Sequence, residues 1–253
     1  MEPPTIGIIG GMGPQAGLAL AEKVIAETNA VRDQEHLPMA LLSYSHKIGD
    51  RSAYVFGQIT KNPGFAIASV ARTLAELGVR VAGIPCNSAH APEIFNTLTS
   101  SLKGVNIRIL HLIQETIRHV QETLPVITKV GCLSTLSVHR LGLYQSAVES
   151  AGLTPIMPSD EIAEHVVHHA IFDPKFGIKA KSAPVTRQAR EMVLSAVRTC
   201  CDLGAEAVIL GCTELPLAVP HMPDVTLIDP ARALARALIR ETSPQKLAPL
   251  LTK

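Results

Sequence analysis

The chain has little that would mark a binder of nucleic acid or membranes. It contains no tryptophan and only 3% aromatic residues, so it lacks the stacking platforms of single-strand binders. It has no basic run, and its formal net charge is +1. No apolar stretch approaches the roughly 18 residues of a membrane span, and Met1-Glu2-Pro3-Pro4 has no basic signal-peptide segment. With 47% hydrophobic and 18% charged residues, the sequence predicts a cytoplasmic globular protein without nucleic-acid or membrane partners.

The chain also lacks an even set of cysteines for a disulfide framework. Its 253 residues include five, which fits a reducing cytosol better. Two of them, Cys86 and Cys212, end segments that match without a gap at an offset of 126 (212 − 86). The coinciding pairs are Ser69/Ser195, Arg72/Arg198, Thr73/Thr199, Leu77/Leu203, Gly78/Gly204 and Cys86/Cys212.

The same duplication reaches the start of each half. Residues 129–135 resemble residues 5–11 at an offset of 124 (129 − 5), and both begin as short apolar runs typical of buried strands. We therefore expect two related domains, one of residues 1–118 plus 221–253 and the other of residues 119–220. Two such domains facing each other would place the repeated thiols on opposite sides of one small ligand.

Strand-like runs alternate with helix-length segments, which predicts βα units and mainly parallel sheets flanked by helices. The expected strands are 5–10, 38–44, 79–85, 106–110, 127–133, 153–157, 205–211 and 225–228. The expected helices are 14–31, 63–77, 90–101, 111–122, 138–150, 160–171, 185–203 and 230–241. Gly78 and Gly204 are the expected C-terminal stops of two helices.

Ligands of open parallel sheets collect beyond the carboxyl ends of the strands, where both repeated cysteines are expected. Each cysteine precedes polar residues at the presumed start of a helix, a position that lowers a thiol pKa. Buried, inert thiols are the alternative, and they account for Cys132, Cys200 and Cys201.

Other motifs allow different chemistry. Gly11, Gly13 and Ala16 fit a loose dinucleotide-binding pattern, but the following strand ends in Ser43-Tyr44 without an acidic ribose ligand. A carboxylate-binding loop or a simple tight turn is the alternative. Arg51 stands in a loop where a guanidinium could grip a carboxylate, although most loop arginines are merely solvated.

Three further groups have equally open interpretations. Lys175, Lys179 and Lys181 are either a solvated basic loop or a second cationic element for an acidic substrate. His165, His168 and His169 lie at helical spacing, without a third-ligand motif for metal. A Cys86/His90 dyad could serve acyl transfer with His90 as the base, but this leaves Cys212 unexplained.

These residues make the chain resemble the aspartate/glutamate racemase family, and within it the free-standing aspartate racemases. The matching motifs are Gly11-Met12-Gly13-Pro14, Asp33-Gln34-Glu35-His36-Leu37-Pro38, Asp50-Arg51, Pro85-Cys86-Asn87-Ser88-Ala89-His90, Leu133-Ser134-Thr135-Leu136-Ser137, Gly177-Ile178-Lys179-Ala180 and Gly211-Cys212-Thr213-Glu214-Leu215-Pro216. The family is cofactor-independent and folds as two pseudo-symmetric α/β domains with the active site in the cleft between them, so the resemblance implies no cofactor, no metal and a homodimer.

The resemblance also implies a role for each matching residue. Cys86 and Cys212 would be the acid/base catalysts, and Cys212 would serve the L face. Arg51 and Lys179 would hold the side-chain carboxylate, with Lys175 as the rival of Lys179. The remaining expected substrate contacts are Met12, Gly13, Asn87, Ser88, Thr135 and Thr213.

The expected reaction is two-base racemisation of an acidic amino acid, aspartate first. One thiolate takes the α-proton while the opposite thiol delivers a proton to the other face, in a dry and closed site that stabilises the developing charge. The enzymatic alternatives are a glutamate or broader amino-acid racemase and enzymes of the maleate isomerase or malonate decarboxylase type. A non-catalytic amino-acid-binding module and a redox dithiol also remain open.

Overall fold

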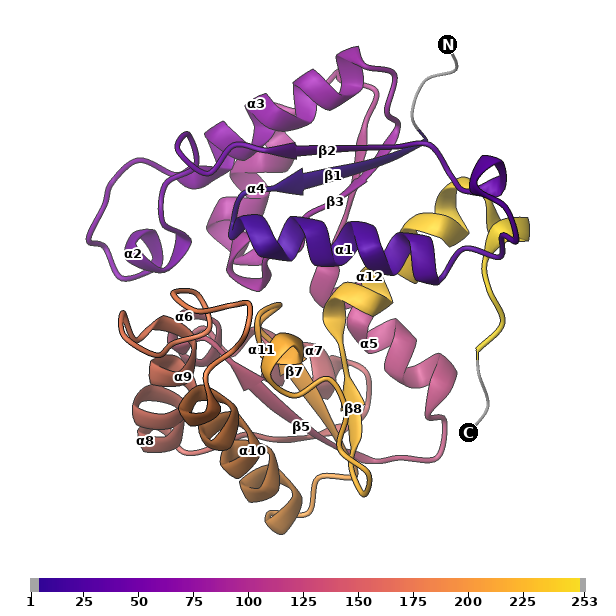
Figure 1. Cartoon of the computed structure of the whole chain (residues 1–253). Coiled ribbons are helices and arrows are strands. Elements are labelled where there is room, and N and C mark those ends of the chain that lie inside the picture. The colour runs from indigo at the N-terminus through magenta and orange to yellow at the C-terminus, as the bar shows by residue number, and fades with distance from the viewer. Residues whose placement is uncertain (1–4, 251–253) are drawn as a thin grey trace. The chain divides into compact units, whose positions relative to one another are not determined.

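Two four-stranded parallel sheets organise the computed structural model, which describes residues 5–250 (Figure 1). The strand order is β2-β1-β3-β4 in the first sheet and β6-β5-β7-β8 in the second. The strands are β1 Ile6–Gly10, β2 Met39–Ser43, β3 Val81–Gly83, β4 Arg108–Leu110, β5 Lys129–Ser134, β6 Thr154–Ile156, β7 Ala207–Gly211 and β8 Thr226–Ile228. All eight expected strands are present, and the predicted α/β class with two pseudo-symmetric parallel sheets is confirmed.

The chain divides into two compact units, each with one of these sheets. The first comprises Met1–Glu115 and Ala231–Lys253, and the second comprises Thr116–Pro230. The α-helices are α1 Pro14–Ala26, α2 Arg51–Val55, α3 Pro63–Glu76, α4 Pro92–Ser101, α5 Leu112–Thr123, α6 Leu136–Arg140, α7 Leu143–Ser150, α8 Asp160–Ile162, α9 His169–Phe172, α10 Arg187–Asp202, α11 Leu215–Ala218 and α12 Pro230–Thr242. Across residues 5–250, none of the helices combines the length and apolar character that crossing a bilayer requires.

The strand register repeats the duplication seen in the sequence. In the first sheet Ile8 pairs with Gly83, and in the second Cys132 pairs with Ile209. These partners are related by the same two sequence offsets, 132 − 8 = 124 and 209 − 83 = 126. The loops that follow β3 and β7, and with them Cys86 and Cys212, therefore occupy equivalent positions in the two sheets.

Close packing explains a glycine that both halves share. A Cβ on Gly7 of β1 would lie 2.7 Å from Val79 Cγ1, and a Cβ on Gly131 of β5 would lie 3.1 Å from Ala205 Cβ. Both neighbours belong to the turn that leads from a long helix into the third strand of the sheet. A side chain on either glycine would push that turn away from the sheet.

The helices before β3 and β7 end in the same way. Gly78 and Gly204 both have a φ of 97°, and their N–H groups bond to Ala75 O and Cys201 O at 3.0 and 2.8 Å. This left-handed conformation is the usual helix stop at glycine. The predicted stops are confirmed.

Some helix boundaries differ from the sequence-based expectation. The predicted helix 14–31 ends at Ala26, because the following backbone pairs with the C-terminal segment: Asn29 N–H donates to Lys246 O at 2.7 Å. The predicted helix 138–150 is two helices separated by Gly142, whose φ is 60°. The predicted helix 160–171 contains a π-helical turn, η3, at Ala163–His168. The short helix α2 was not predicted, and the helix presumed to start after Cys212 is the four-residue α11.

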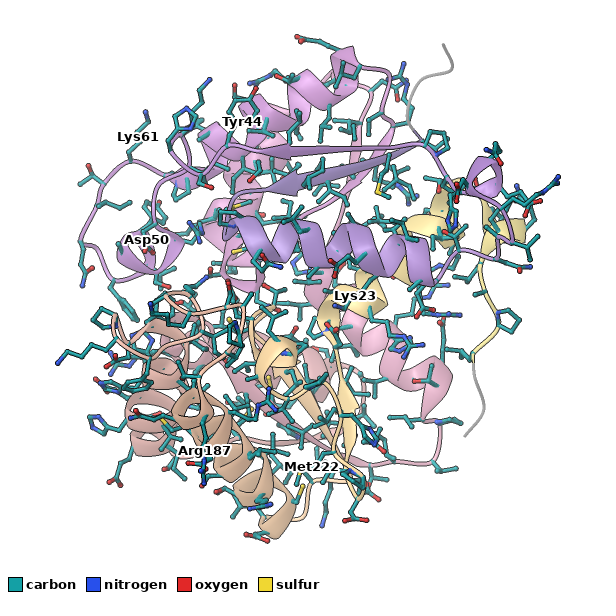
Figure 2. All side chains as sticks on the ribbon, in the orientation of Figure 1. Lys23, Tyr44, Asp50, Lys61, Arg187 and Met222 are labelled. Carbon is teal, nitrogen blue, oxygen red and sulfur yellow. The ribbon has the colours of Figure 1, made fainter. Side chains whose placement is uncertain are left out.

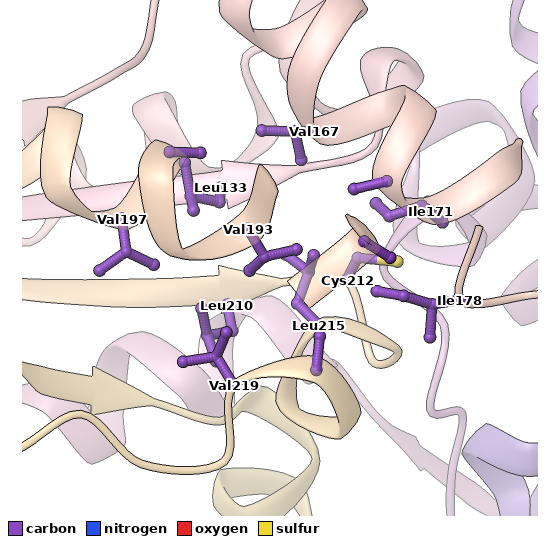
Figure 3. Packing of buried hydrophobic residues seen from close by; sticks show 14 of the residues in the cluster. Leu133, Val167, Ile171, Ile178, Val193, Val197, Leu210, Cys212, Leu215 and Val219 are labelled. Atoms are coloured by element: carbon purple, nitrogen blue, oxygen red, sulfur yellow. The ribbon is translucent and has the colours of Figure 1, made fainter. Parts of the chain in front are cut away.

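Each sheet carries its own apolar core. In the first unit, Ile6 and Ile8 pack with Leu20 of α1 and with Leu234 and Leu238 of α12. In the second unit, strands β5 and β7 pack with α10, and the cluster extends to Ile178, Cys212 and Leu215 (Figure 3). Cys212 thus lies at the sheet's carboxyl edge with apolar side chains around it.

Candidate active site

The expected site residues, together with Glu214, form two groups, one in each unit. We call Met12, Gly13, Arg51, Cys86, Asn87 and Ser88 the first half-site, and Thr135, Lys179, Cys212, Thr213 and Glu214 the second half-site. In the first sheet they follow the carboxyl ends of β1, β2 and β3, and in the second most follow β5 and β7. Parallel strands place these ends along one edge of each sheet.

The Cys86 thiol is buried and linked to the hydroxyl of a neighbour. Cys86 is 5% exposed, and its Sγ lies 3.4 Å from Ser88 Oγ. It precedes a single 3-10 turn, η2 (Asn87–His90), rather than the α-helix expected from residue 90 onward, which begins at Pro92. Residues 87–90 are all buried.

His90 is held as a neutral structural residue. The backbone N–H of Leu112 donates to His90 Nε2 at 3.2 Å, so that nitrogen carries no proton and His90 Nδ1–H donates to Cys86 O at 2.9 Å. Burial, together with nearby His111, lowers the pKa of His90 from 6.5 to about 3. Because both ring nitrogens bond to the backbone, the Cys86/His90 dyad with His90 as a base does not form.

The buried, neutral His90 predicts a pH dependence of stability. Below pH 6.5 the unfolded chain binds a proton at this residue while the folded chain does not, so the free energy of unfolding falls as the pH drops. Between pH 6.5 and 4.5 the slope approaches about 1.4 kcal/mol per pH unit. Urea unfolding at several pH values should show it, and His90→Gln should flatten it; an unchanged slope in the variant would contradict the assignment.

Arg51 connects the loops after β1 and β2. It is the first residue of α2, whose N-cap Asp50 accepts a hydrogen bond from Ala53 N–H at 3.0 Å (Figure 2). The Arg51 guanidinium donates to Met12 O at 3.4 Å and to Gly49 O at 3.1 Å. Helix α2 also contacts η2, which follows Cys86. The Met12 loop, the arginine and the first thiol therefore gather at one end of the first sheet.

The glycine-rich loop after β1 is shaped by packing. Gly11 has a φ of 93°, and a Cβ there would lie 2.8 Å from Ser45 N and 2.9 Å from Tyr44 N. The space beside the glycine is filled by the backbone of the next loop. This supports the tight-turn interpretation over a phosphate cradle.

The second half-site is built around a chain of three side chains. The Cys212 thiol donates to Glu214 Oε2 at 3.0 Å, and Lys179 Nζ forms an ion pair with Glu214 Oε1. Cys212 is 5% exposed and Glu214 is 4% exposed, whereas the Lys179 side chain retains 27% exposure. The carboxylate thus bridges a buried thiol and a partly solvated cation.

This environment shifts the pKa of the Cys212 thiol upward, whereas the sequence predicts a lowered pKa. Burial raises the pKa of Cys212 well above its ordinary value, and the Glu214 charge adds to this, while Lys179 acts in the opposite direction. Burial alone would raise the pKa of Glu214, but the Lys179 charge and the hydrogen bonds lower it overall. The helix after Cys212, α11, has only four residues, so its dipole is too short to offset burial.

Hydroxyl groups complete the second half-site. Thr213 Oγ1 donates to Glu214 Oε2 at 3.4 Å, and Thr135 Oγ1 lies 3.3 Å from Ser137 Oγ. Ser134 pairs with Gly211 at the ends of β5 and β7, so Thr135 and Cys212 are the residues that directly follow these adjacent strands. Both threonines are buried.

The loop that carries Lys179 distinguishes it from Lys175. The backbone N–H of Lys175 donates to Asp173 Oδ1 at 2.8 Å in a solvent-exposed turn. Ile178 is fully buried in the same core cluster as Cys212, which anchors the following Lys179 beside Glu214. Lys179 is thus the lysine ion-paired within the second half-site.

The loop that carries Lys179 packs so closely at Gly177 that there is no room for a side chain. A Cβ on Gly177 would lie 2.5 Å from Asp173 N and 2.6 Å from Asp173 O, both backbone atoms. Gly177→Ala should therefore lower the free energy of unfolding by about 2 to 4 kcal/mol in denaturant titrations. Gly152→Ala, where nothing lies within 4 Å of the new Cβ, should cost about 1 kcal/mol from its backbone angle alone. Equal losses would contradict this account.

The histidine motif does not form a metal site in the described part of the chain. His165, His168 and His169 lie on η3 and α9, and His165 stacks on His169 at a ring distance of 6.0 Å. Over residues 5–250, no group of three or more His, Cys, Asp or Glu side chains is arranged to hold a metal ion.

Glu214 accepts a hydrogen bond from the Cys212 thiol. The sequence did not indicate it as a functional residue. The motif Gly211-Cys212-Thr213-Glu214 contained it, but a glutamate two residues beyond a cysteine gives no signal that its carboxylate turns back to the thiol. The turn after β7, in which Leu215 N–H bonds to Cys212 O at 2.9 Å, produces that geometry.

The two sheets thus define a duplicated parallel α/β protein with one buried site cysteine after the third strand of each sheet. The chain belongs to the Asp/Glu/Hydantoin racemase family, whose model matches residues 9–238. It is a racemase-family enzyme with the two-domain fold of that family.

Individual relatives agree with this membership. An aspartate racemase from Picrophilus torridus has 27% identity and a TM-score of 0.78, with 94% of each chain covered. An aspartate racemase homologue from Pyrococcus horikoshii OT3 has 25% identity and a TM-score of 0.68, covering 95% of this chain and 99% of its own. The broad specificity amino-acid racemase RacX of Bacillus subtilis is 22% identical, over 92% of this chain and 96% of RacX.

Proposed function

We propose that the protein interconverts L- and D-aspartate by a cofactor-independent two-base mechanism that uses Cys86 and Cys212. The observation that carries this proposal is the equivalence of the two thiols: each is buried and follows the third strand of a sheet, at positions related by the repeated register. The proposal takes the two domains expected from the sequence as the two sides of one substrate site.

The chemistry requires one thiolate and one thiol. The thiolate removes the Cα proton and becomes a thiol, while the opposite thiol protonates the other face of Cα and becomes a thiolate. The carbon centre is inverted, and the two sulfur atoms have exchanged protonation states. Cys212 would serve the L face and Cys86 the D face.

The surrounding residues would orient the substrate for this exchange. Arg51 and Lys179 would hold the side-chain carboxylate, and Asn87, Ser88, Thr135 and Thr213 would hold the α-carboxylate and amino group. The Met12-Gly13 backbone, which Arg51 contacts, would add to the substrate-binding wall. Buried surroundings strengthen such contacts and help stabilise the charge that develops at Cα.

The proposal also specifies which acidic amino acid is the substrate. The aspartate racemase from Picrophilus torridus supports aspartate, whereas RacX supports a broader range. Aspartate and glutamate differ by one methylene, which distinguishes substrates by only about 1 to 3 kcal/mol. A glutamate or broad-specificity racemase is therefore the second candidate.

A chiral assay over a panel of L-amino acids in D2O tests this function. We expect D-aspartate that carries deuterium at Cα. Conversion of maleate or loss of CO2 from a malonate would instead support an isomerase or decarboxylase. Stabilisation by aspartate without any inversion would support an amino-acid-binding module.

The expected homodimer and cytoplasmic location remain part of the proposal. Light scattering after size-exclusion chromatography would test the dimer, which should have twice the 27.0 kDa mass of the chain.

A further inference from the structure

The two carboxylate oxygens of Glu214 serve different partners. Oε1 faces Lys179, while Oε2 accepts from the Cys212 thiol at 3.0 Å and from Thr213 Oγ1 at 3.4 Å. The carboxylate is almost completely buried. A buried carboxylate depends on such partners to remain ionised, so its proton affinity responds to the position of Lys179.

The proposed function gives Lys179 a second carboxylate to bind. The side-chain carboxylate of an acidic amino acid would compete with Glu214 for the same ammonium group. The Lys179 side chain is 27% exposed whereas Glu214 is buried, so the ammonium can turn toward a ligand more easily than the carboxylate can follow it.

We propose that Glu214 is a positioning residue that couples capture of the substrate carboxylate by Lys179 to deprotonation of Cys212; this rests on the proposed function. When Lys179 shifts toward the substrate, Glu214 loses neutralising charge and takes the thiol proton. The S–H bond breaks, an O–H bond forms on Oε2, and the electron pair stays on sulfur. After turnover of L-aspartate, Cys212 holds the former Cα proton and Cys86 is the thiolate. On product release Glu214 gives its proton to solvent and Cys86 takes one from solvent, which restores the starting state.

The coupling predicts a substrate class. An amino acid without a side-chain carboxylate cannot draw Lys179 away from Glu214, so Cys212 stays protonated. The effect appears in the kcat for the L enantiomer at saturation as well as in its KM, because the Cys212 thiolate itself is missing. The proposal therefore restricts efficient turnover to acidic amino acids.

Glu214→Gln tests the coupling through opposite effects on binding and turnover. The amide retains the side-chain size but removes the competitor for Lys179, so the Kd of succinate, an unreactive dicarboxylate, should fall about tenfold. The kcat for aspartate should fall about 100-fold, because the amide cannot take the thiol proton. Weaker succinate binding, or an unchanged kcat, would overturn the proposal.

A matched control separates this effect from the general loss of a buried ion pair. Glu115→Gln breaks the pair with Arg240 in the first unit, where the side chains are 15% and 22% exposed. It should change neither the succinate Kd nor kcat. Glu214→Asp restores the charge and should recover part of the kcat lost in Glu214→Gln, whereas a purely structural role predicts no recovery.

The wild-type protein provides a test that does not depend on folding of a variant. We expect its kcat for alanine to lie at least about 100-fold below that for aspartate. Comparable kcat values would overturn the coupling while leaving the racemase function intact. Failure to racemise any amino acid would instead overturn the proposed function, and the succinate affinities of the wild type and Glu214→Gln would still decide whether Glu214 competes for Lys179.

Discussion

Replacing either repeated cysteine with alanine should lower the kcat of aspartate racemisation at least about 10³-fold, since each variant lacks one of the two acid/base groups. Cys86→Ala and Cys212→Ala should lose similar amounts in both directions, because every turnover uses both sulfurs. The measurement is polarimetry or chiral chromatography from each enantiomer. Circular dichroism should show that both variants remain folded.

Cys201→Ala is the matched control for these variants. Cys201 is a partly exposed thiol on α10, outside both half-sites, and its removal should leave turnover near that of the wild type. Near-full activity in Cys86→Ala or Cys212→Ala would rule out the two-thiol mechanism.

Replacing Arg51 with methionine should reduce kcat/KM for aspartate about 100-fold or more, the loss expected when a buried carboxylate loses a charge-assisted bidentate contact. The guanidinium is held toward the Met12 loop by hydrogen bonds to Met12 O and Gly49 O. Arg51→Lys should rescue little, because an ammonium cannot reproduce the planar fork. Steady-state kinetics with both enantiomers would measure the effect.

Arg187→Met provides the control for the loss of a positive charge. The Arg187 side chain is 91% exposed and pairs with Glu191 on the surface of α10, so kcat/KM should stay unchanged. If Arg51→Met retained full kcat/KM for aspartate, the carboxylate would have to bind elsewhere.

The sequence predicted the fold well because its signals are local and repeated. Short apolar runs define all eight strands, and the glycine stops at Gly78 and Gly204 end the same helix in each half. The error at the end of α1 has a different origin, because a distant part of the chain decides where this helix stops. Helix α1 stops at Ala26 because residues 27–29 pair with the segment around Lys246 and Leu247, which no local pattern reveals.

The candidate site was predictable in its residue types but not in its contacts. The repeat indicated Cys86 and Cys212, and the motifs indicated Arg51 and Lys179. The raised pKa of Cys212 and the role of Glu214 depend on burial and on one turn after β7. These properties arise from three-dimensional packing. The presumed start of a helix after Cys212, which is all that the sequence shows, does not reveal them.

The neutral state of His90 has the same origin. Its proximity to Cys86 in the sequence suggests a catalytic base, but the fold places Leu112 N–H against one ring nitrogen and Cys86 O against the other. A histidine four residues from a cysteine can thus bond to the backbone of its own loop and to that of helix α5 instead of to the thiol.

Hydrogen exchange during a single round of racemisation tests the central claim most directly. L-Aspartate is incubated with the protein in D2O, and both enantiomers are separated at low conversion for mass analysis at Cα. Two sulfur groups on opposite faces predict that the newly formed D-aspartate carries deuterium while the remaining L-aspartate keeps protium. D-Aspartate that retains its original protium, or equal deuterium in both enantiomers, would show that one group serves both faces and would contradict the account.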